Sequence, residues 1–221
     1  MTTLEAVRVW DLPTRVFHWL LAATIVGSVV SAKVGGNAMV WHLRFGVLVV
    51  ALLLFRLVWG FAGGRWSRFA SFMPTRPRLR AFWRGERGLD IGHSPLGALS
   101  VLAMLAMLAL QVATGLVADD EIATTGPWNR HVSNATAALA TGWHKNIGQW
   151  TILALVGLHV AAIAFYDLRQ RKRLVRAMIG GDKPLAPGTP ASADGALARA
   201  AALAIFAACV ALVLWLIGGE L

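Results

Sequence analysis

Five long apolar stretches constrain the fold of this chain more than any other feature. They cover residues 16–34, 40–61, 96–118, 147–165 and 200–219. Each is close to the roughly 20 residues that an α-helix needs to cross the hydrocarbon core of a membrane. With 57% hydrophobic and only 14% charged residues, the chain does not have the composition of a soluble domain. The sequence therefore predicts an all-α membrane protein.

The basic residues are unevenly distributed along the chain. Lys and Arg total 21 against 11 Asp and Glu, and they cluster after the second and fourth apolar stretches. These two clusters contain Arg65, Arg68, Arg76, Arg78, Arg80, Arg84 and Arg87, and Arg169, Arg171, Lys172, Arg173, Arg176 and Lys183. If the spans alternate in direction, both clusters lie on one side of the membrane, and the acidic run 119–121 lies on the other. The positive-inside rule then places the N-terminus in the cytoplasm and the C-terminus outside. The charge thus reports topology, and we expect no nucleic-acid partner.

The segment between the fourth and fifth spans divides the chain. Residues 182–198 are rich in Pro, Gly, Ser and Ala, a composition typical of a flexible cytoplasmic linker. We therefore predict a four-helix transmembrane core at 1–181, this linker at 182–198, and an additional C-terminal transmembrane helix at 199–221. The only cysteine is Cys209, which excludes an internal disulfide, a cysteine-ligated iron–sulfur cluster and covalent haem attachment.

Four histidines can be sorted by their depth in the spans. His18 opens the first span on the cytoplasmic side, His42 opens the second from outside, and His144 precedes the fourth. His159 follows His144 by 15 residues, which on an α-helix is roughly 22 Å along the axis and about 60° around it. Depth therefore pairs His18 with His159 near the cytoplasm and His42 with His144 near the outer face.

Two imidazoles from facing helices at one depth are suited to ligate a haem iron from both sides. Zinc is the alternative metal, but it needs three or four protein ligands, and only two histidines are available at each depth. Taken singly, an intramembrane histidine also serves as a hydrogen-bonding group between helices. His93, just before the Ser94-Pro95 helix start, is a competing candidate for the cytoplasmic site.

Residues near the outer histidine pair extend the candidate site. Gly46 and Gly148 each follow an outer histidine by four residues, where a missing side chain lets a flat ring approach the backbone, although small residues also serve ordinary helix packing. Arg44 follows His42 by two residues. It is suited to pair with a haem propionate or, alternatively, to extend toward lipid headgroups.

Several motifs resemble the bacterial cytochrome b561 and nickel–iron hydrogenase cytochrome b family, over roughly residues 7–184. They are Val9-Trp10-Asp11, Arg15-Val16-Phe17-His18-Trp19, Trp41-His42-Leu43-Arg44-Phe45-Gly46, Gly92-His93-Ser94-Pro95-Leu96-Gly97, Thr114-Gly115-Leu116 with Gly126-Pro127, Gly142-Trp143-His144 and Gly157-Leu158-His159. The resemblance implies a four-helix haem-binding bundle with two noncovalent b haems, ligated by the same histidine pairs. The fifth span departs from the short members of the family. Hydrogenase cytochrome subunits often have it, and their additional histidine near the third helix keeps His93 in question.

The resemblance also implies a role. We expect electron transfer in the bacterial inner membrane, within a respiratory chain, between a quinone and either a periplasmic c-type cytochrome or a hydrogenase. Membrane lipid is a further partner, a bound quinone and a homodimer are possible, and no catalytic residue is expected. One alternative is a superoxide:quinone oxidoreductase, with Arg44, Lys145 and Arg130 attracting the anion that the acidic run 119–121 would repel. A proton or metal transporter that uses the histidines as a relay is the third hypothesis.

Overall fold

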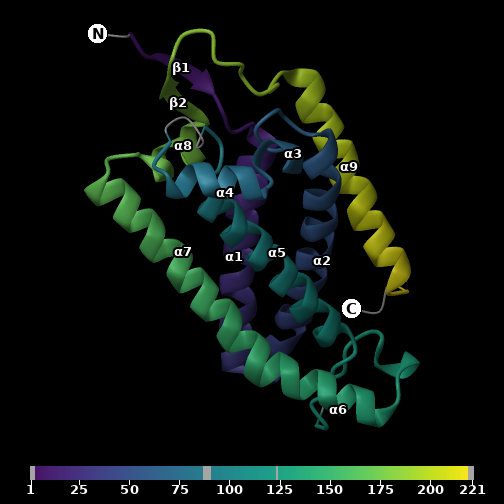
Figure 1. Cartoon of the computed structure of the whole chain (residues 1–221). Coiled ribbons are helices and arrows are strands. Elements are labelled where there is room, and N and C mark those ends of the chain that lie inside the picture. Colours follow the sequence, from purple (N-terminus) through teal and green to yellow (C-terminus); the bar gives the residue numbers. More distant parts are fainter. Residues whose placement is uncertain (1–2, 87–90, 123, 219–221) are drawn as a thin grey trace. The chain divides into compact units, whose positions relative to one another are not determined.

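The structure is a computed structural model that describes residues 3–86, 91–122 and 124–218. Figure 1 shows that long helices dominate it. They are α1 (Leu12–Val34), α2 (Met39–Ala62), α5 (Pro95–Leu116), α7 (Gln149–Arg169) and α9 (Ala196–Leu216). The five helical stretches that contain them are long and apolar enough to cross a membrane. The prediction of an all-α, multi-pass membrane protein is therefore confirmed.

Shorter elements connect the long helices. They are β1 (Glu5–Arg8), η1 (Gly36–Ala38), α3 (Phe69–Phe72), α4 (Arg76–Trp83), η2 (Asn129–His131), α6 (Asn134–Gly142), η3 (Trp143–Gly148), α8 (Leu174–Gly180) and β2 (Asp182–Leu185). Two of them, α6 and η3, continue into α7 without a break, so this helical stretch runs from Asn134 to Arg169. It starts well before the predicted residue 147 because its first turns are too polar to register as an apolar span. The middle segment, η3, is a π-helix.

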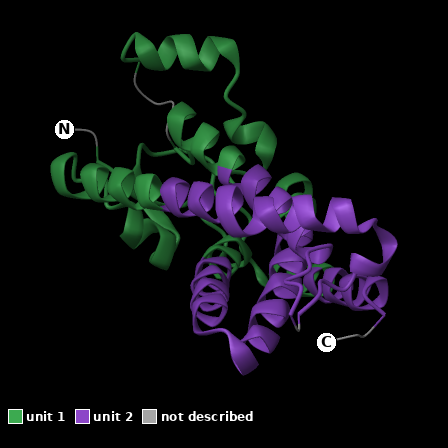
Figure 2. Ribbon diagram, turned by 90° about the horizontal axis from the view of Figure 1, so that it is seen from below, with its two compact units in different colours: residues 1–18, 56–103, 157–205 green, residues 19–55, 104–156, 206–221 purple. Residues whose placement is uncertain are grey.

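The chain divides into two compact units, shown in different colours in Figure 2. Unit 1 comprises residues 1–18, 56–103 and 157–205. Unit 2 comprises residues 19–55, 104–156 and 206–221. Every boundary falls inside a long helix, so each of the five long helices contributes residues to both units.

In unit 2 the fifth long helix packs on the second. Val213 and Ile217 of α9 form a buried cluster with Val47 and Ala51 of α2, and the α9 ring of Phe206 meets an α2 phenylalanine edge to face. Because lipid is as apolar as these side chains, close van der Waals packing rather than the hydrophobic effect holds such helices together. The fifth helix is thus in direct contact with the predicted four-helix core.

In unit 1 a fully buried carboxylate begins α1. Asp11 accepts hydrogen bonds from the backbone N–H of Thr14 at 2.8 Å and from the Trp59 indole at 3.1 Å. Its second oxygen accepts a hydrogen bond from the Ser67 hydroxyl. A carboxylate can be buried only when donors replace its water shell. Asp11 thereby caps α1 and ties it to α2 and to the loop that follows α2.

The linker segment differs from the flexible connection that its composition predicts. Its first residues form β2, which pairs antiparallel with β1. Further on, Ser192 donates to the carbonyl of Val9, and Asp194 accepts from the backbone N–H of Leu12 at 2.9 Å. Backbone and side-chain hydrogen bonds to the N-terminal residues thus hold the segment in unit 1. The composition of the segment does not predict these contacts, because the partners are distant in the sequence.

Candidate functional site

The four histidines singled out by depth lie in two facing pairs. In unit 1, His18 of α1 and His159 of α7 have ring centres 6.4 Å apart, with the ring planes at 48°. In unit 2, His42 of α2 and His144 of η3 have ring centres 5.9 Å apart, with the planes at 85°. The structure therefore brings together the residues that depth pairs. It also places His144 inside a helical segment rather than before one.

The spacing of the rings provides a test of whether a metal fits between them. An imidazole nitrogen lies about 2.0 Å from a bound metal and about 1.1 Å from its own ring centre, so two imidazoles on opposite sides of one ion have centres roughly 6 Å apart. The two observed separations, 6.4 and 5.9 Å, match this value. Both pairs therefore fit an ion held between two rings, such as a haem iron.

The hydrogen bonds of His42 fix which of its nitrogens is available. Its Nδ1 lies 2.9 Å from the backbone carbonyl of Ser28 on α1 and 3.1 Å from the hydroxyl of the same serine. A carbonyl only accepts, so Nδ1 carries a proton, and in a neutral imidazole the lone pair is then on Nε2. A metal-binding histidine commonly has such a partner on its other nitrogen, which holds the ring in place.

The ring of His144 is oriented in the same way from another helix. Its Nδ1 lies 2.9 Å from the backbone carbonyl of Gln111 on α5, which again leaves Nε2 with the lone pair. Gly115, one turn further along α5, permits this approach, because a Cβ there would lie 2.7 Å from Cε1 of the ring. The unit 2 pair is therefore surrounded by residues from four helical segments.

The unit 1 pair has different surroundings. Both rings are half-buried, and His159 has no hydrogen bond among the residues that the structure describes. Gly157, two residues before His159, faces open space at its missing Cβ. The His159 ring is therefore placed by its own helix rather than by a hydrogen bond among the described residues.

The His93 ring of unit 1 lies between two aromatic rings. Its ring centre is 4.7 Å from that of Trp10 and 4.6 Å from that of Phe72. Burial, reinforced by the nearby charges of Arg56 and Lys183, lowers the pKa of His93 to about 3. His93 is therefore a neutral, aromatically packed residue of unit 1. No histidine ring faces it among the described residues.

The remaining predicted site residues have mixed surroundings. Gly46 faces open space at its missing Cβ, whereas a Cβ at Gly148 would overlap the side-chain amide of Gln111. Arg44 is exposed and its guanidinium stacks on the Trp41 ring at 5.1 Å. The room predicted at Gly46 is present, while the close neighbour of Gly148 is another side chain. The haem-binding role of these three residues stays a prediction.

Three residues that orient the unit 2 pair were not predicted, namely Ser28, Gln111 and Gly115. A signal for one of them exists, because Gln111 is an amide side chain within an apolar span, where a polar group needs a partner. A backbone carbonyl or a missing Cβ has no such signature in a sequence. In the described part of the chain, no three His, Cys, Asp or Glu side chains gather as a metal site, so the zinc alternative gains no ligands.

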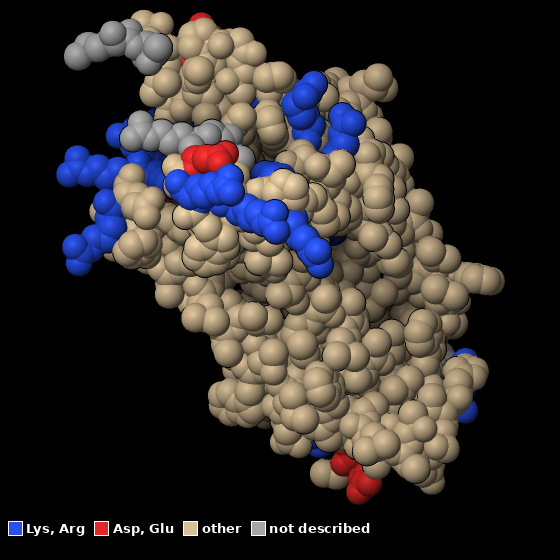
Figure 3. Space-filling view, viewed as in Figure 1, with Lys and Arg blue, Asp and Glu red and all other residues tan. Residues whose placement is uncertain are grey.

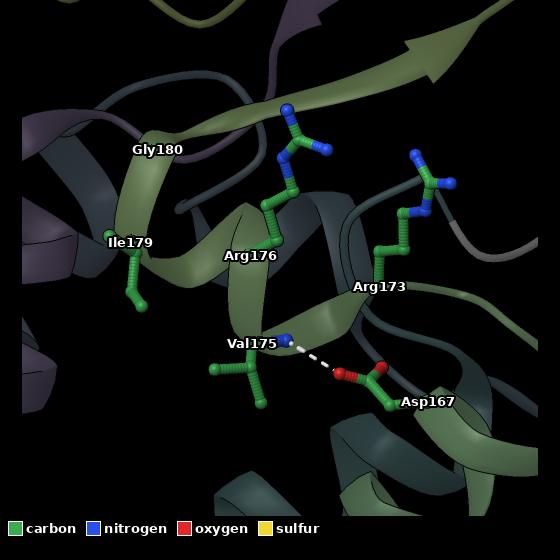
Figure 4. A pocket seen from close by; sticks show the side chains of 6 residues that line it. All are labelled: Asp167, Arg173, Val175, Arg176, Ile179 and Gly180. Carbon is green, nitrogen blue, oxygen red and sulfur yellow. Dashed lines mark hydrogen bonds between the residues drawn. The ribbon is translucent and has the colours of Figure 1, made fainter.

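An open depression of about 580 Å³ lies elsewhere in unit 1, beside α8. Figure 4 shows the Asp167 carboxylate directed at the backbone nitrogen of Val175, while the side chains of Arg173 and Arg176 extend away from it. Asp167 also accepts from the N–H of Leu174, so its carboxylate caps the start of α8. The depression is therefore a structural feature of a helix start.

Basic side chains gather on the surface of unit 1. Figure 3 shows Lys and Arg over α4 and around α8. The α4 sequence is Arg-Pro-Arg-Leu-Arg-Ala-Phe-Trp, and Trp83 at its end is 73% exposed. A basic segment with an exposed indole is typical of the boundary between lipid headgroups and water.

Five membrane-length helices that carry facing imidazoles define a class of protein, the membrane cytochromes of the b type. The comparison with known families agrees, because the family described as prokaryotic cytochrome b561 matches residues 9–181. The chain belongs to the prokaryotic cytochrome b561 family. It is a membrane cytochrome b of electron transfer, for which the family implies a b-type haem.

Curated relatives are similar over most of their length. A protein of Bradyrhizobium diazoefficiens is 23% identical over 212 residues, covering 80% of this chain and 85% of the relative. One from Cupriavidus necator is 26% identical over 214 residues, covering 81% and 87%. Both are named probable Ni/Fe-hydrogenase B-type cytochrome subunit. A protein of Escherichia coli K12, named probable Ni/Fe-hydrogenase 1 B-type cytochrome subunit, is 23% identical over 211 residues, covering 78% and 88%. No solved structure matches the chain significantly.

Proposed function

We propose that this chain holds two b haems, one between His18 and His159 and one between His42 and His144. The observation that carries the proposal is the pair of imidazole separations, 6.4 and 5.9 Å, each within one compact unit. A haem held by two imidazoles has no open coordination position, so it supplies one-electron transfer rather than chemistry on a bound substrate. In unit 2 the chain's own residues orient both rings.

The surroundings of the unit 2 pair support this assignment. Two backbone carbonyls hold the Nδ1 protons of His42 and His144, so both rings present a lone pair on Nε2. In this proposal Gly46 gives the macrocycle room, and Arg44 turns from Trp41 toward a propionate. Gly148 acts indirectly, by making room for the Gln111 side chain that contacts His144.

We further propose that the redox partners are a membrane quinone and a hydrogenase. The relatives' names support the second partner, because each is called a hydrogenase cytochrome subunit. A cytochrome with five membrane-length helices has access to a lipid-soluble carrier, which supports the first. The chain then links oxidation of hydrogen to reduction of quinone in a respiratory chain.

The direction of insertion follows from charge. The basic segments over α4 and around α8 belong to unit 1, whereas the acidic residues 119–121 belong to unit 2. By the positive-inside rule, the basic loops face the cytoplasm. The N-terminus then lies in the cytoplasm and the C-terminus in the periplasm, with the His42 and His144 pair near the periplasmic face.

The test is a haem count together with a partner assay. Chain purified from membranes in mild detergent should contain two haems per polypeptide and show b-type bands on reduction. Membranes that contain the chain and a hydrogenase should reduce quinone with hydrogen, and membranes without the chain should not. One haem or none in a haem-supplemented preparation would refute the two-haem assignment. Hydrogen-dependent quinone reduction that does not need the chain would refute the partner assignment.

A further inference from the structure

Gln111 contacts His144 through both its backbone and its side chain. Its backbone carbonyl lies 2.9 Å from Nδ1 of the His144 ring. Its side-chain amide donates to the backbone carbonyl of His144, also at 2.9 Å. One residue of α5 therefore fixes the ring of His144 and the backbone that bears it.

The backbone that receives this hydrogen bond is π-helical. His144 lies in the π-helical segment η3, between the α-helices α6 and α7. A π-helical turn is rare and often marks a functional site, because it redirects a side chain relative to the regular helix on either side. A donor from a neighbouring helix adds a hydrogen bond to the backbone of this turn. The Gln111 amide is that donor.

Two glycines make the contact possible. A Cβ at Gly148 would overlap the Gln111 amide oxygen and lie 3.0 Å from the Trp143 indole nitrogen. A Cβ at Gly115 would press on the His144 ring. Among the described residues, the Gln111 amide oxygen and the Trp143 indole nitrogen are both buried without a hydrogen-bond partner. The Gln111 side chain thus lies against Gly148, whose missing Cβ leaves it room.

We propose that Gln111 is the positioning residue of the unit 2 haem site. Its side-chain amide holds the π-helical turn, and its carbonyl holds the ring so that Nε2 is presented toward His42. This inference rests on the proposed function, since it gives the two hydrogen bonds a purpose in haem ligation. Gln111 itself touches neither iron nor substrate.

The experiment uses the full chain in detergent, with Gln111→Leu as the test and Gln149→Leu as its matched control. Gln149 is also half-buried and lies close to His144, but its side chain makes no hydrogen bond among the described residues. For each protein, the measurements are the electron paramagnetic resonance signals of the oxidised haems, their midpoint potentials and the rate of haem transfer to apomyoglobin. His144→Ala identifies which signal belongs to the unit 2 site.

In Gln111→Leu we expect two bound haems, with a changed resonance signal and a shifted potential for the unit 2 haem only. Loss of a contact to a metal-binding histidine typically weakens metal binding by 10- to 100-fold. Because the carbonyl contact to Nδ1 remains, we expect the lower end, about tenfold faster haem release. Gly148→Ala, which displaces the amide while leaving Gln111 in place, should give the same one-site change. Gln149→Leu should match the wild type.

The inference is overturned if Gln111→Leu matches the wild type at both sites. Equal changes at both haems would also overturn it, because they would mean a general loosening of the bundle. Failure of the proposed function looks different: the wild type would then lack the second haem, or His144→Ala would remove none.

Discussion

The two histidine pairs have similar spacing but different supports. In unit 2, backbone carbonyls of α1 and α5 hold both rings by Nδ1, and a glycine lets one ring approach α5. In unit 1, His159 has no hydrogen bond among the described residues, and the order nearby comes from the buried carboxylate of Asp11 and its donors. Hydrogen bonds therefore orient both unit 2 rings before any cofactor binds, whereas the His159 ring of unit 1 depends on how firmly α7 is held.

The largest expected effect comes from removing one histidine of each pair. His144→Ala should abolish the unit 2 haem and leave the unit 1 haem, and His159→Ala should do the reverse, because an iron that needs two imidazoles is not held by one. Haem content and the reduced spectrum check this, with two haems falling to one in each variant. Loss of both haems from either substitution would mean that the two sites fold as one and that the comparison between them fails.

The second largest expected effect comes from removing the buried carboxylate of unit 1. Asp11→Ala leaves the donors of Thr14, Trp59 and Ser67 without their acceptor. Hydrogen bonds to charged groups contribute about 1.5–3 kcal/mol each, so we expect a loss of roughly 3 kcal/mol in stability after relaxation. Thermal unfolding in detergent measures this loss.

The haem spectra of the same variant test whether the two histidine pairs differ in what supports them. Because Asp11 belongs to unit 1, the haem of His18 and His159 should broaden or be lost first, while the unit 2 haem keeps its potential. Asp167→Ala is a matched control, since it removes another helix-capping carboxylate of unit 1 that is not packed on α1. A unit 2 haem that is more sensitive than the unit 1 haem to Asp11→Ala would contradict our account of what supports each pair.

A methyl group added at Gly115 should affect the haem site of unit 2. The added Cβ would lie 2.7 Å from Cε1 of His144, and relieving such a clash typically costs about 1–3 kcal/mol. Gly115→Ala should therefore weaken retention of the unit 2 haem, measured by transfer to apomyoglobin. Gly142→Ala is the control, because nothing lies within 4 Å of its missing Cβ. If both substitutions behaved alike, the position of the His144 ring against α5 would not matter.

The sequence predicts the parts of this molecule that depend on composition along the chain. Five apolar stretches predict five helices, and the depth of each histidine in its span predicts which rings meet. Ser94 begins α5 as expected, because its hydroxyl accepts from the N–H of Gly97 at 3.1 Å. These features are local, or depend only on the alternation of spans.

What the sequence does not predict depends on contacts between distant segments. The π-helical turn at His144 receives a hydrogen bond from Gln111, 33 residues away. The linker becomes ordered because Ser192 and Asp194 meet the first residues of the chain. A composition rich in Pro, Gly and Ser describes only the linker's own preferences. Contacts between distant segments also explain Gly148. The sequence predicts that its missing side chain gives a haem room, but the group beside it is the Gln111 side chain of α5.

The smallest expected effect concerns Asp194, which joins the start of α9 to unit 1. It accepts from Leu12 and Arg199 and lies 3.3 Å from the Arg8 guanidinium. Burial alone would raise the pKa of Asp194, but the hydrogen bonds from Arg199 and Leu12 outweigh it and leave the pKa below its ordinary value of 3.8. Ionised Asp194 therefore stabilises the folded chain.

The sign of the pH dependence follows from this lowered pKa. The stabilisation by Asp194 is complete above the unfolded pKa of 3.8 and is lost as the pH falls through the lower pKa of the folded chain. Asp194→Asn should thus cost about 1 kcal/mol or less at neutral pH, because its arginine partners are partly exposed. The difference in melting temperature from the wild type should shrink as the pH is lowered below about 4. Because the substitution leaves both histidine pairs intact, both haem spectra should stay unchanged. A change in the unit 1 spectrum alone would show that the linker also supports the unit 1 pair.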